Sequence, residues 1–434
     1  MKRVLMIAYH FPPLAGSSGI QRTLRFVQQL PKFGWQPVVL TVHPRSYEKT
    51  SDDLMADVPP GTLVQRAFGF DTARHLSAFG RYPAGLARPD RWMSWRFDAV
   101  RQGMRLIREH EPQAIWSTYP IATAHSIGAD LQHRSGLPWV ADFRDPMAQE
   151  GYPEDRLTWQ MFSDIEQRAM KHATTCVFTT PGAAQMYSQR YRGAGAGIEV
   201  IENGYDEASF ADLPAPGSLA APGPLTLLHS GAVYPSERDP TALFEALAAL
   251  RDSHHIQPRD LRIRFRAAVH DDLLQTLAAR LNVLEFIETL PPIPYREALA
   301  EMTSADALLI IQAANCNAQI PAKLYEYLRA RRPLVGLTDP TGDTASALRA
   351  VGGHYQAPLD DAAAIAGVLM QLVADRQGGV LQLPREEAVI ASSRESRTRA
   401  LARLLERACE GPRALDVAGD DAARTYDRHA LPTT

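Results

Sequence analysis

The segment Ile320-Pro-Ala-Lys-Leu-Tyr-Glu-Tyr-Leu-Arg-Ala-Arg-Arg-Pro-Leu-Val-Gly-Leu337 predicts a loop, a short helix and then a buried strand. Pro321 suits the start of a helix, because its missing N–H would be unpaired there. Lys323 falls in the first turn, where the helix dipole disfavours a cation by roughly 0.3–1 kcal/mol unless an anion is near. Glu326 shares a face with Lys323. The segment therefore predicts either a phosphate receptor beside a sugar hydroxyl or an exposed helix with an incidental ion pair.

The bulk composition is that of an ordinary globular protein. The 434 residues are enough for two or three domains, and 45% are hydrophobic and 22% charged. A net charge of −3 implies no global electrostatic partner. The cysteines, Cys176, Cys316 and Cys409, are few and far apart, which indicates a reducing compartment and no metal cluster.

The chain shows no sign of a secretion signal or a membrane span. The basic and then apolar start stops at His10 and Pro12, too early for a signal peptide. No stretch approaches the roughly 20 apolar residues of a spanning helix. We therefore expect a soluble or peripheral protein in the cytoplasm.

Short apolar runs alternate with longer helical patterns in the first half of the chain. The runs are continuously apolar, which is typical of a parallel sheet covered on both faces. Predicted strands are 4–8, 38–42, 114–117, 139–141, 176–179 and 198–201, and predicted helices are 21–33, 95–110, 122–135 and 158–172.

The same alternation restarts after a Pro/Gly/Ala-rich stretch over 212–224. Two successive series predict an α/β fold of two Rossmann-like doubly wound domains that face a central cleft, where ligands bind. Predicted strands are 225–230, 263–267, 284–288, 307–311 and 334–337, and predicted helices are 241–250, 273–282, 295–302, 323–330 and 343–351. We expect an N-terminal domain (1–205), a linker (206–224), a C-terminal domain (225–385), a helix returning to the N-terminal domain (386–411) and a flexible tail (412–434).

The loop after the first predicted strand is rich in glycine. Gly16 and Gly19 permit close backbone approach to a ligand, and Arg22 adds charge early in the next helix. The loop lacks the G-x-G-x-x-G pattern, so a dinucleotide fingerprint is absent. It predicts either backbone donors for an oxyanion or a purely structural turn.

The segment Val140-Ala-Asp-Phe-Arg-Asp-Pro146 follows another predicted strand. Its charged side chains, Asp142, Arg144 and Asp145, cannot all be buried without partners, so they suit a ligand-facing loop. A surface turn capped by Asp145 is the alternative. The segment has no D-x-D pattern, and we expect no metal. His125, on a preceding helix, is either structural or in contact with a ligand.

A third loop joins a strand ending at Ser230 to a helix starting near Thr241. Gly231 opens it, and the guanidinium of Arg238 is placed to grip a diphosphate bidentately. Asp239 offers the alternative of capping the helix and pairing with Arg238. We favour the diphosphate, because Lys323 independently predicts the same anion.

Residues 70–110 combine eight arginines with four acids and interleaved aromatic residues. This combination suits a membrane-surface element or a site for an anionic lipid acceptor. It equally suits an ordinary solvated helix with a tryptophan anchor. Nucleic acid is not expected, because the domain as a whole is not basic.

In their order and spacing, these motifs resemble the GT-B glycosyltransferases, specifically family 4, from Met1 to about residue 410. The matching segments are the 12–22 opening, Asp142-Phe-Arg-Asp-Pro146, Ile201-Glu-Asn-Gly-Tyr-Asp206, His229-Ser-Gly231 with Arg238, and Pro321-Ala-Lys-Leu-Tyr-Glu326. The resemblance implies transfer of a hexosyl group from a UDP- or GDP-sugar to a glycan or polyprenyl-linked acceptor at the inner membrane face, as in polysaccharide biosynthesis. It also implies a retained anomeric configuration and neither a metal nor any cofactor beyond that co-substrate.

The resemblance also assigns roles to residues. Arg238 and Lys323 would hold the diphosphate and stabilise the leaving group's charge, Glu326 would bind the ribose, and the side chains of the 142–145 segment and His125 would face the acceptor. The residues so assigned to catalysis are Arg238, Lys323, Asp145 and His125. Those assigned to the nucleotide sugar are Gly16, Gly19, Gly231, Arg238, Lys323, Glu326 and Thr344.

One departure concerns the family's Glu-x7-Glu pattern, whose first glutamate would fall at Ala318. Either backbone amides with Asn315, Asn317 or Gln319 position the sugar, or the donor differs from the common ones. Two other functions stay open. A nucleotide-sugar epimerase would need an acid–base pair from His125 and the 142–145 segment. A non-catalytic nucleotide-sugar binder would fit the missing glutamate.

Overall fold

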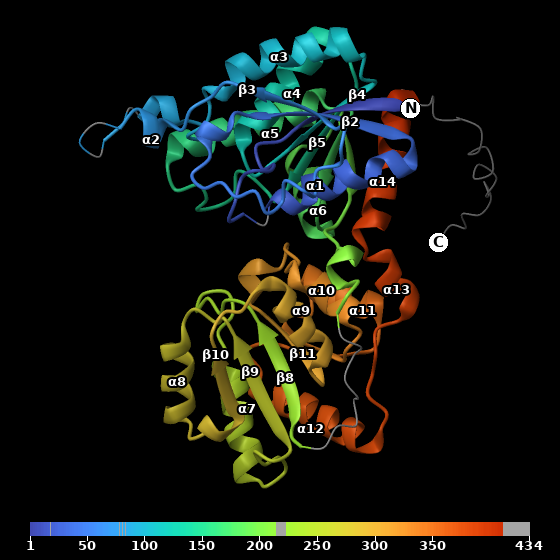
Figure 1. The fold of residues 1–434 in the computed structure, drawn as a ribbon. Helices are drawn as coiled ribbons and strands as arrows, with labels where there is room; N and C mark the ends of the chain where they lie inside the picture. The colour runs from blue at the N-terminus through green and yellow to red at the C-terminus, as the bar shows by residue number, and fades with distance from the viewer. Residues whose placement is uncertain (18, 78, 80, 83, 214–222, 411–434) are drawn as a thin grey trace, which may run out of the picture.

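The computed structural model describes residues 1–410 except 18, 78, 80, 83 and 214–222. Two parallel sheets, each covered by helices on both faces, form two α/β domains (Figure 1). The predicted fold class is therefore confirmed. The predicted tail, and the part of the predicted linker over 214–222, lie outside the described residues.

The N-terminal sheet has seven parallel strands in the order β3-β2-β1-β4-β5-β6-β7. The order reverses between β1 and β4, which is where doubly wound sheets bind ligands. The strands are β1 (Lys2–Ile7), β2 (Trp35–Val42), β3 (Leu63–Ala67), β4 (Ala114–Thr118), β5 (Trp139–Arg144), β6 (Thr175–Phe178) and β7 (Gly197–Val200).

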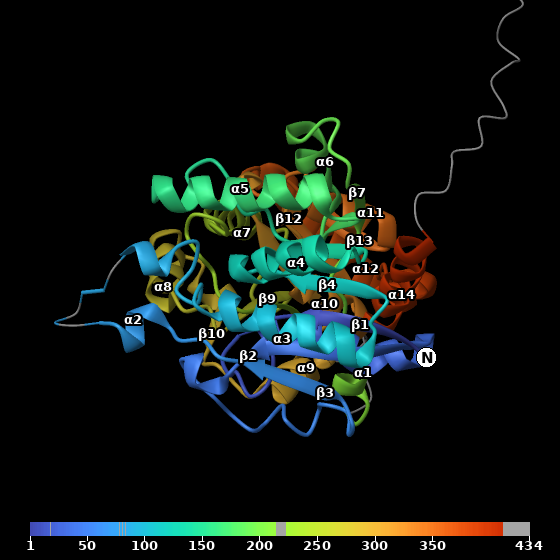
Figure 2. The same cartoon turned by 90° about the horizontal axis from the view of Figure 1, so that it is seen from above.

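Helices cover both faces of this sheet. One face carries α3 (Trp95–His110), α4 (Ala122–Ser135) and α5 (Arg156–His172), which lie across the sheet in the view from above (Figure 2). The other face carries α1 (Gly19–Gln29) and α6 (Pro181–Arg190), on the side of the C-terminal domain.

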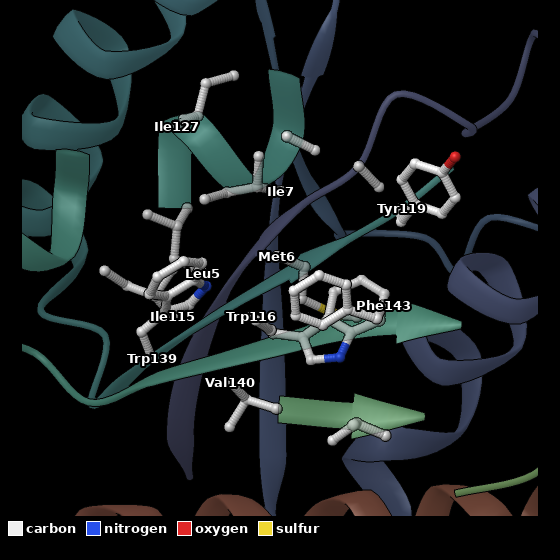
Figure 3. Close-up of a cluster of buried hydrophobic side chains, with 14 of the residues drawn as sticks. Leu5, Met6, Ile7, Ile115, Trp116, Tyr119, Ile127, Trp139, Val140 and Phe143 are labelled. Atoms are coloured by element: carbon white, nitrogen blue, oxygen red, sulfur yellow. The ribbon is translucent and has the colours of Figure 1, made fainter. Parts of the chain in front are cut away.

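The central strands are apolar on both sides because helices cover both faces. Side chains of β1, β4 and β5, including Trp116 and Trp139, pack with Phe143 in the core that Figure 3 shows. Trp139 Nε1 donates a hydrogen bond to Ser117 Oγ over 2.8 Å, so its one polar atom is satisfied. Burying an apolar side chain of this size stabilises the fold by about 1.5–3 kcal/mol.

The C-terminal sheet repeats the plan with six parallel strands in the order β10-β9-β8-β11-β12-β13. Its strands are β8 (Leu225–Ser230), β9 (Leu261–Arg266), β10 (Ile287–Leu290), β11 (Ala307–Gln312), β12 (Leu334–Thr338) and β13 (His354–Ala357). The helices are α7 (Thr241–Asp252), α8 (Asp271–Arg280), α9 (Tyr295–Ser304), α10 (Lys323–Ala330), α11 (Asp343–Val351) and α12 (Ala362–Gly378). The switch point lies between β8 and β11.

Two helices take the place of the one continuous helix expected: α13 (Glu386–Ala391) packs against α11 of the C-terminal domain, and α14 (Arg394–Glu410) returns to the N-terminal domain. The break occurs where the linker crosses. Tyr205 N donates to Ser392 O over 3.2 Å, and Arg394 N donates to Tyr205 O over 2.8 Å. Beyond the break, α14 runs along the N-terminal domain (Figure 1), and its Leu401 and Leu405 are buried in the core of that domain.

The 70–110 region contains a short α2 (Thr72–His75), followed by a loop and then α3. Five of its arginines form ion pairs within the protein, namely Arg88, Arg91, Arg96, Arg101 and Arg105. Trp95 is fully buried, whereas Phe97 is 73% exposed. No described helix is long and apolar enough to cross a membrane.

Candidate active site

The loops after β8 and β11 meet at the switch point of the C-terminal sheet. Gly231 follows β8 directly and has a φ of +111°, a conformation that favours glycine. Lys323 begins α10, and a Cβ placed on Gly231 would lie 3.2 Å from Lys323 Nζ. Glycine at this position therefore lets the ammonium group approach the loop after β8.

His229, near the end of β8, contacts the ammonium group of Lys323. Its Nδ1 lies 2.9 Å from the carbonyl oxygen of Leu309, so Nδ1 carries the hydrogen and donates. Nε2 then accepts from Lys323 Nζ over 3.1 Å. Burial, followed by the charge of Lys323, holds the pKa of His229 well below its usual range, so the ring is neutral. His229 was not predicted as a site residue, although a histidine in an apolar strand was a usable signal.

Arg238 lies on the same loop as Gly231. It donates from Nη1 to the carbonyl oxygen of Ala232 and lies over the ring of Tyr234, 5.3 Å from its centre. Asp239 accepts from Thr241 instead, and Arg238 has no ion pair among the residues that the structure describes. The alternative of an Asp239–Arg238 pair is therefore not realised.

The charge of Arg238 acts on Lys323. Burial first, and then the Arg238 charge, lowers the pKa of Lys323 to about 7, against the opposing effect of Glu326. Two cations that repel one another in a partly buried site stabilise an anion placed between them. The Lys323–Arg238 pair is thus suited to a diphosphate.

Glu326 and Thr344 occupy different surroundings. Glu326 Oε1 accepts from Tyr295 OH over 2.7 Å, and burial raises the pKa of Glu326. Thr344 is almost fully buried and donates from Oγ1 to the carbonyl oxygen of Gln319 over 3.1 Å. Thr344 therefore fixes the segment before α10 in this structure.

The two domains touch at the position of the absent glutamate. Thr180 Oγ1 donates to the carbonyl oxygen of Ala318 over 2.8 Å. Beside it, Gly182 N, at the start of α6, donates to Asp343 Oδ2 over 2.8 Å. A Cβ on Gly182 would lie 2.6 Å from that oxygen and 3.2 Å from Ala318 Cα. Glycine is thus needed for this contact between the domains.

On the N-terminal side, the loops after β1 and β5 are tied together. Gly16 has a φ of +77° and no atom within 4 Å of a built Cβ. Gly19 is closely packed, since a Cβ there would lie 2.2 Å from His10 Nδ1. The carbonyl oxygen of Gly19 accepts from Arg144 Nη1 over 3.2 Å. Arg144 therefore holds the glycine loop next to the end of β5.

Asp142 does not face the cleft as expected. Its two carboxylate oxygens accept from Arg22 Nε and Nη2 over 2.8 and 2.9 Å, and both side chains are buried. Arg22 also donates to the carbonyl oxygens of Ile201 and Glu202. The pair joins α1, β5 and the segment after β7. Asp142 also accepts from Thr118 Oγ1 and is fully buried, out of reach of a substrate in the cleft.

Asp145 and His125 differ in their exposure to solvent. Asp145 is solvent accessible, although the protein around it raises its pKa, chiefly by desolvation. His125 is fully buried, with Nδ1 2.8 Å from Ser117 Oγ and its ring against Phe143. Burial lowers the pKa of His125 to about 4. We therefore retain Asp145 as a candidate for acceptor contact and leave His125 out of the candidate set.

Two hollows lie beside the candidate site residues of the C-terminal domain. One, of ≈580 Å³, lies at the carboxyl ends of the C-terminal strands and is lined by Asp239, Glu245, Asp339 and Asp360. Four carboxylates do not suit a diphosphate, so we place the phosphates at Lys323 and Arg238. The other, of ≈290 Å³, lies between the domains beside Glu326. Among the described residues, no group of three or more His, Cys, Asp or Glu side chains is placed to hold a metal ion.

Known families and solved structures resemble this chain in its N-terminal domain and in its fold. Residues 18–204 match the model of the glycosyl transferase 4-like domain. Comparison with curated protein sequences gives no match. The chain is similar in fold to HepE from Anabaena in complex with UDP and glucose (TM-score 0.61, 13% identity, 94% of this chain and 100% of that chain).

Two further solved structures share the fold. A glycosyltransferase from Rickettsia africae gives a TM-score of 0.60 at 13% identity, over 95% of this chain and 99% of that chain. Sucrose-phosphate synthase from Thermosynechococcus elongatus gives a TM-score of 0.57 at 14% identity, over 94% and 97%. At these identities, the likeness shows the two-domain fold.

Proposed function

We propose that this chain, a GT-B glycosyltransferase with a glycosyl transferase 4-like N-terminal domain, transfers a hexosyl group from a nucleotide diphosphate sugar to a glycan or lipid-linked sugar. The N-terminal domain (1–205) would bind the acceptor, and the C-terminal domain (225–385) the donor. The observation that supports this most is the placement of Lys323 and Arg238 together at the switch point of the C-terminal sheet. We favour a UDP-linked donor, because HepE was crystallised with UDP and with UDP-glucose.

Lys323 and Arg238 would act on the leaving diphosphate. When the bond between C1 of the sugar and the phosphate oxygen breaks, negative charge accumulates on that oxygen. Fixed cations in a partly dry site stabilise this charge more in the transition state than in the ground state. They supply the positive charge that a divalent metal supplies in other transferases, so we propose a metal-independent reaction. The acceptor hydroxyl oxygen bonds to C1 and gives up its proton to the departing diphosphate, and we propose that the anomeric configuration is retained.

Other residues would orient the donor and the acceptor. Glu326 would accept hydrogen bonds from the ribose, and the loop with Gly16 and Gly19 would approach the donor from the opposite domain. Gln319 is exposed and its side chain makes no hydrogen bond to a described residue, so it is the amide that we place at the donor sugar in the absence of the glutamate. Asp145 would contact acceptor hydroxyls.

We extend the proposal to contact with the inner face of a membrane. Exposed apolar side chains follow α2 along the chain, at Leu76, Phe79, Tyr82 and Leu86. Apolar side chains next to arginines suit the interface of an anionic bilayer. This placement favours a lipid-linked acceptor, delivered along the membrane surface.

An epimerase is disfavoured because two of its candidate acid–base groups are buried. Asp142 is enclosed by Arg22, and His125 is fully buried. To separate the possibilities, the purified protein is incubated with a panel of UDP- and GDP-sugars. Slow release of free nucleotide supports transfer. Interconversion of sugars would support an epimerase, and tight binding without either reaction would support a binder.

A substitution at Lys323 tests the proposed role directly. Lys323→Ala is expected to lower nucleotide release by at least about a hundredfold, since it removes a fixed charge from the leaving group. The unfolding temperature is expected to stay close to that of the wild type, because the lysine is partly buried at a cost to its charge. Lys171→Ala, at an exposed position of α5, is the matched control. Collapse of the fold in Lys323→Ala would instead make the lysine structural.

A further inference from the structure

The ≈290 Å³ hollow between the domains has a chemistry of its own. It is lined by the start of α1, the end of β5, the linker around Tyr205, and the first residues of α9, α10 and α14. Lys323 and Arg238 are not among its lining residues. The hollow therefore adjoins the proposed diphosphate site without sharing its cations.

Three arginines line this hollow. The charge of Arg22 is matched by the buried carboxylate of Asp142. Arg144 donates only to carbonyl oxygens, those of Gly19 and Tyr119. The guanidinium of Arg394 makes neither a hydrogen bond nor an ion pair with any residue of the described chain. Two of the three cations therefore have no carboxylate partner.

The carboxylates of the hollow offset this charge only in part, since Asp206 acts on both Arg394 and Arg25. Asp206 lies 3.1 Å from Arg25 and is paired with it. Glu326 accepts from Tyr295, and burial raises its pKa against the opposing effects of Tyr295 and Arg394. An excess of positive charge remains in a partly enclosed space.

The titration of the arginines shows the same excess. Burial, and then the charge of Arg22, lowers the pKa of Arg394 to about 10. Burial, and then Arg22, also lowers the pKa of Arg144. A guanidinium is almost never perturbed in this direction unless it is desolvated next to other cations. An anion bound among them would relieve this repulsion.

We propose that Arg394 and Arg144 bind a phosphate or carboxylate group of the acceptor, which makes the acceptor an anionic glycan or a diphosphate-linked sugar. This rests on the proposed function, because it assumes that the donor diphosphate occupies Lys323 and Arg238. Planar guanidinium groups bind both kinds of oxyanion bidentately. Arg144 belongs to the N-terminal domain, which is the side that we assign to the acceptor.

The position of Arg394 in the fold places the proposed anion site between several elements. Arg394 is the first residue of α14, directly after the crossing with the linker at Tyr205. Arg144 ends β5, and Glu326 lies on α10 of the other domain. An anion held by the two arginines therefore lies in a hollow lined by residues of both domains, of the segment around Tyr205 and of the first turn of α14.

The test uses the full chain saturated with UDP, so that the donor site is occupied. Inorganic pyrophosphate, glucuronate and neutral glucose are titrated by calorimetry into the wild type, Arg394→Gln and Arg394→Lys. Arg399→Gln, at an exposed position of the same helix, is the matched control. Unfolding temperatures establish that each variant is folded.

We expect pyrophosphate or glucuronate, but not glucose, to bind the wild type, and Arg394→Gln to weaken that binding by about tenfold or more. Arg394→Lys should lie between the two, and Arg399→Gln should equal the wild type. Tighter binding of glucuronate points to a sugar carboxylate, and tighter binding of pyrophosphate points to a lipid-carrier diphosphate. The affinity for UDP should change by less than about twofold in Arg394→Gln.

Three results would overturn the inference. They are equal binding of the anions to Arg394→Gln and the wild type, no binding of either anion to the UDP-saturated wild type, and displacement of UDP by the anions. If UDP itself fails to bind the wild type, the proposed function fails instead. Titration of glucuronate without UDP then still decides whether Arg394 binds an anion.

Discussion

The lowered pKa of Lys323 makes nucleotide binding dependent on pH. With a pKa of about 7, the ammonium group is half neutral at pH 7 in the free protein and almost wholly neutral at pH 9. A bound diphosphate stabilises the charged form, so binding above pH 7 requires uptake of a proton. In the limit of full coupling, the Kd for UDP rises by up to about fiftyfold between pH 7 and pH 9.

Calorimetry of UDP binding at pH 7, 8 and 9 measures this effect, and buffers of different ionisation enthalpy report the proton uptake. The second phosphate pKa of about 6 keeps the diphosphate of UDP almost fully ionised in this range. Lys323→Gln should bind UDP weakly and without the pH slope. The reasoning is refuted if the wild-type Kd is flat from pH 7 to 9, or if Lys323→Gln keeps the slope.

Loss of stability cannot mimic this result. The folded-state pKa of Lys323, about 7, lies below its ordinary value of 10.5. Between these two values the unfolded chain binds more protons than the folded protein. The contribution of Lys323 to stability therefore rises as the pH increases from 7 towards 10.5. A weaker affinity at pH 9 would thus accompany a more favourable contribution to folding from the same residue.

Two further substitutions test the framework around the site. Gly182→Ala should lower turnover by about tenfold to a hundredfold by displacing the domain contact at Ala318. Gly367→Ala, where a built Cβ meets no atom within 4 Å, should leave turnover unchanged. Equal turnover of both variants in a nucleotide-release assay would contradict the role of the contact. Asp142→Asn should lower the free energy of unfolding by about 3–5 kcal/mol, because it leaves the Arg22 guanidinium buried without its carboxylate. Denaturant unfolding measures this free energy. A loss below about 1 kcal/mol would show that the pair is dispensable.

The sequence predicted the central strands well, because they are continuously apolar. The strands β3 (Leu63–Ala67) and β13 (His354–Ala357) were missed. Both lie at sheet edges, where polar residues such as Gln65 and Gln356 interrupt the apolar run. Helix α12 (Ala362–Gly378) was missed because its first turns are apolar all round and show no single stripe. The predicted strand at 284–288 begins with a short 3₁₀ helix, Leu284–Phe286, and becomes a strand only at Ile287.

The candidate site was predictable where its residues follow strand ends within one domain. Gly231 and Lys323 met this condition, since the loops after β8 and β11 meet at the switch point. Arg394 did not, because it reaches the cleft only through a helix that returns from the other end of the chain. The burial of Asp142 under Arg22 was also beyond the sequence, because only the tertiary fold brings these two residues together.

Position 318 is Ala in place of a glutamate, which changes the chemistry of this segment. Hydrogen bonds still hold the segment in place. Asn315 donates to a carbonyl oxygen of the loop after β8, and Asn317 donates to a carboxylate of the loop after β12. The carbonyl oxygen of Ala318 accepts from Thr180 of the other domain. The two asparagines are therefore committed to holding the segment, and Gln319 is left with an exposed amide. A neutral amide donates as well as accepts, whereas a carboxylate only accepts. The proposed donor site thus keeps its cations for the diphosphate, while its recognition of the sugar need not follow the pattern of relatives with the glutamate.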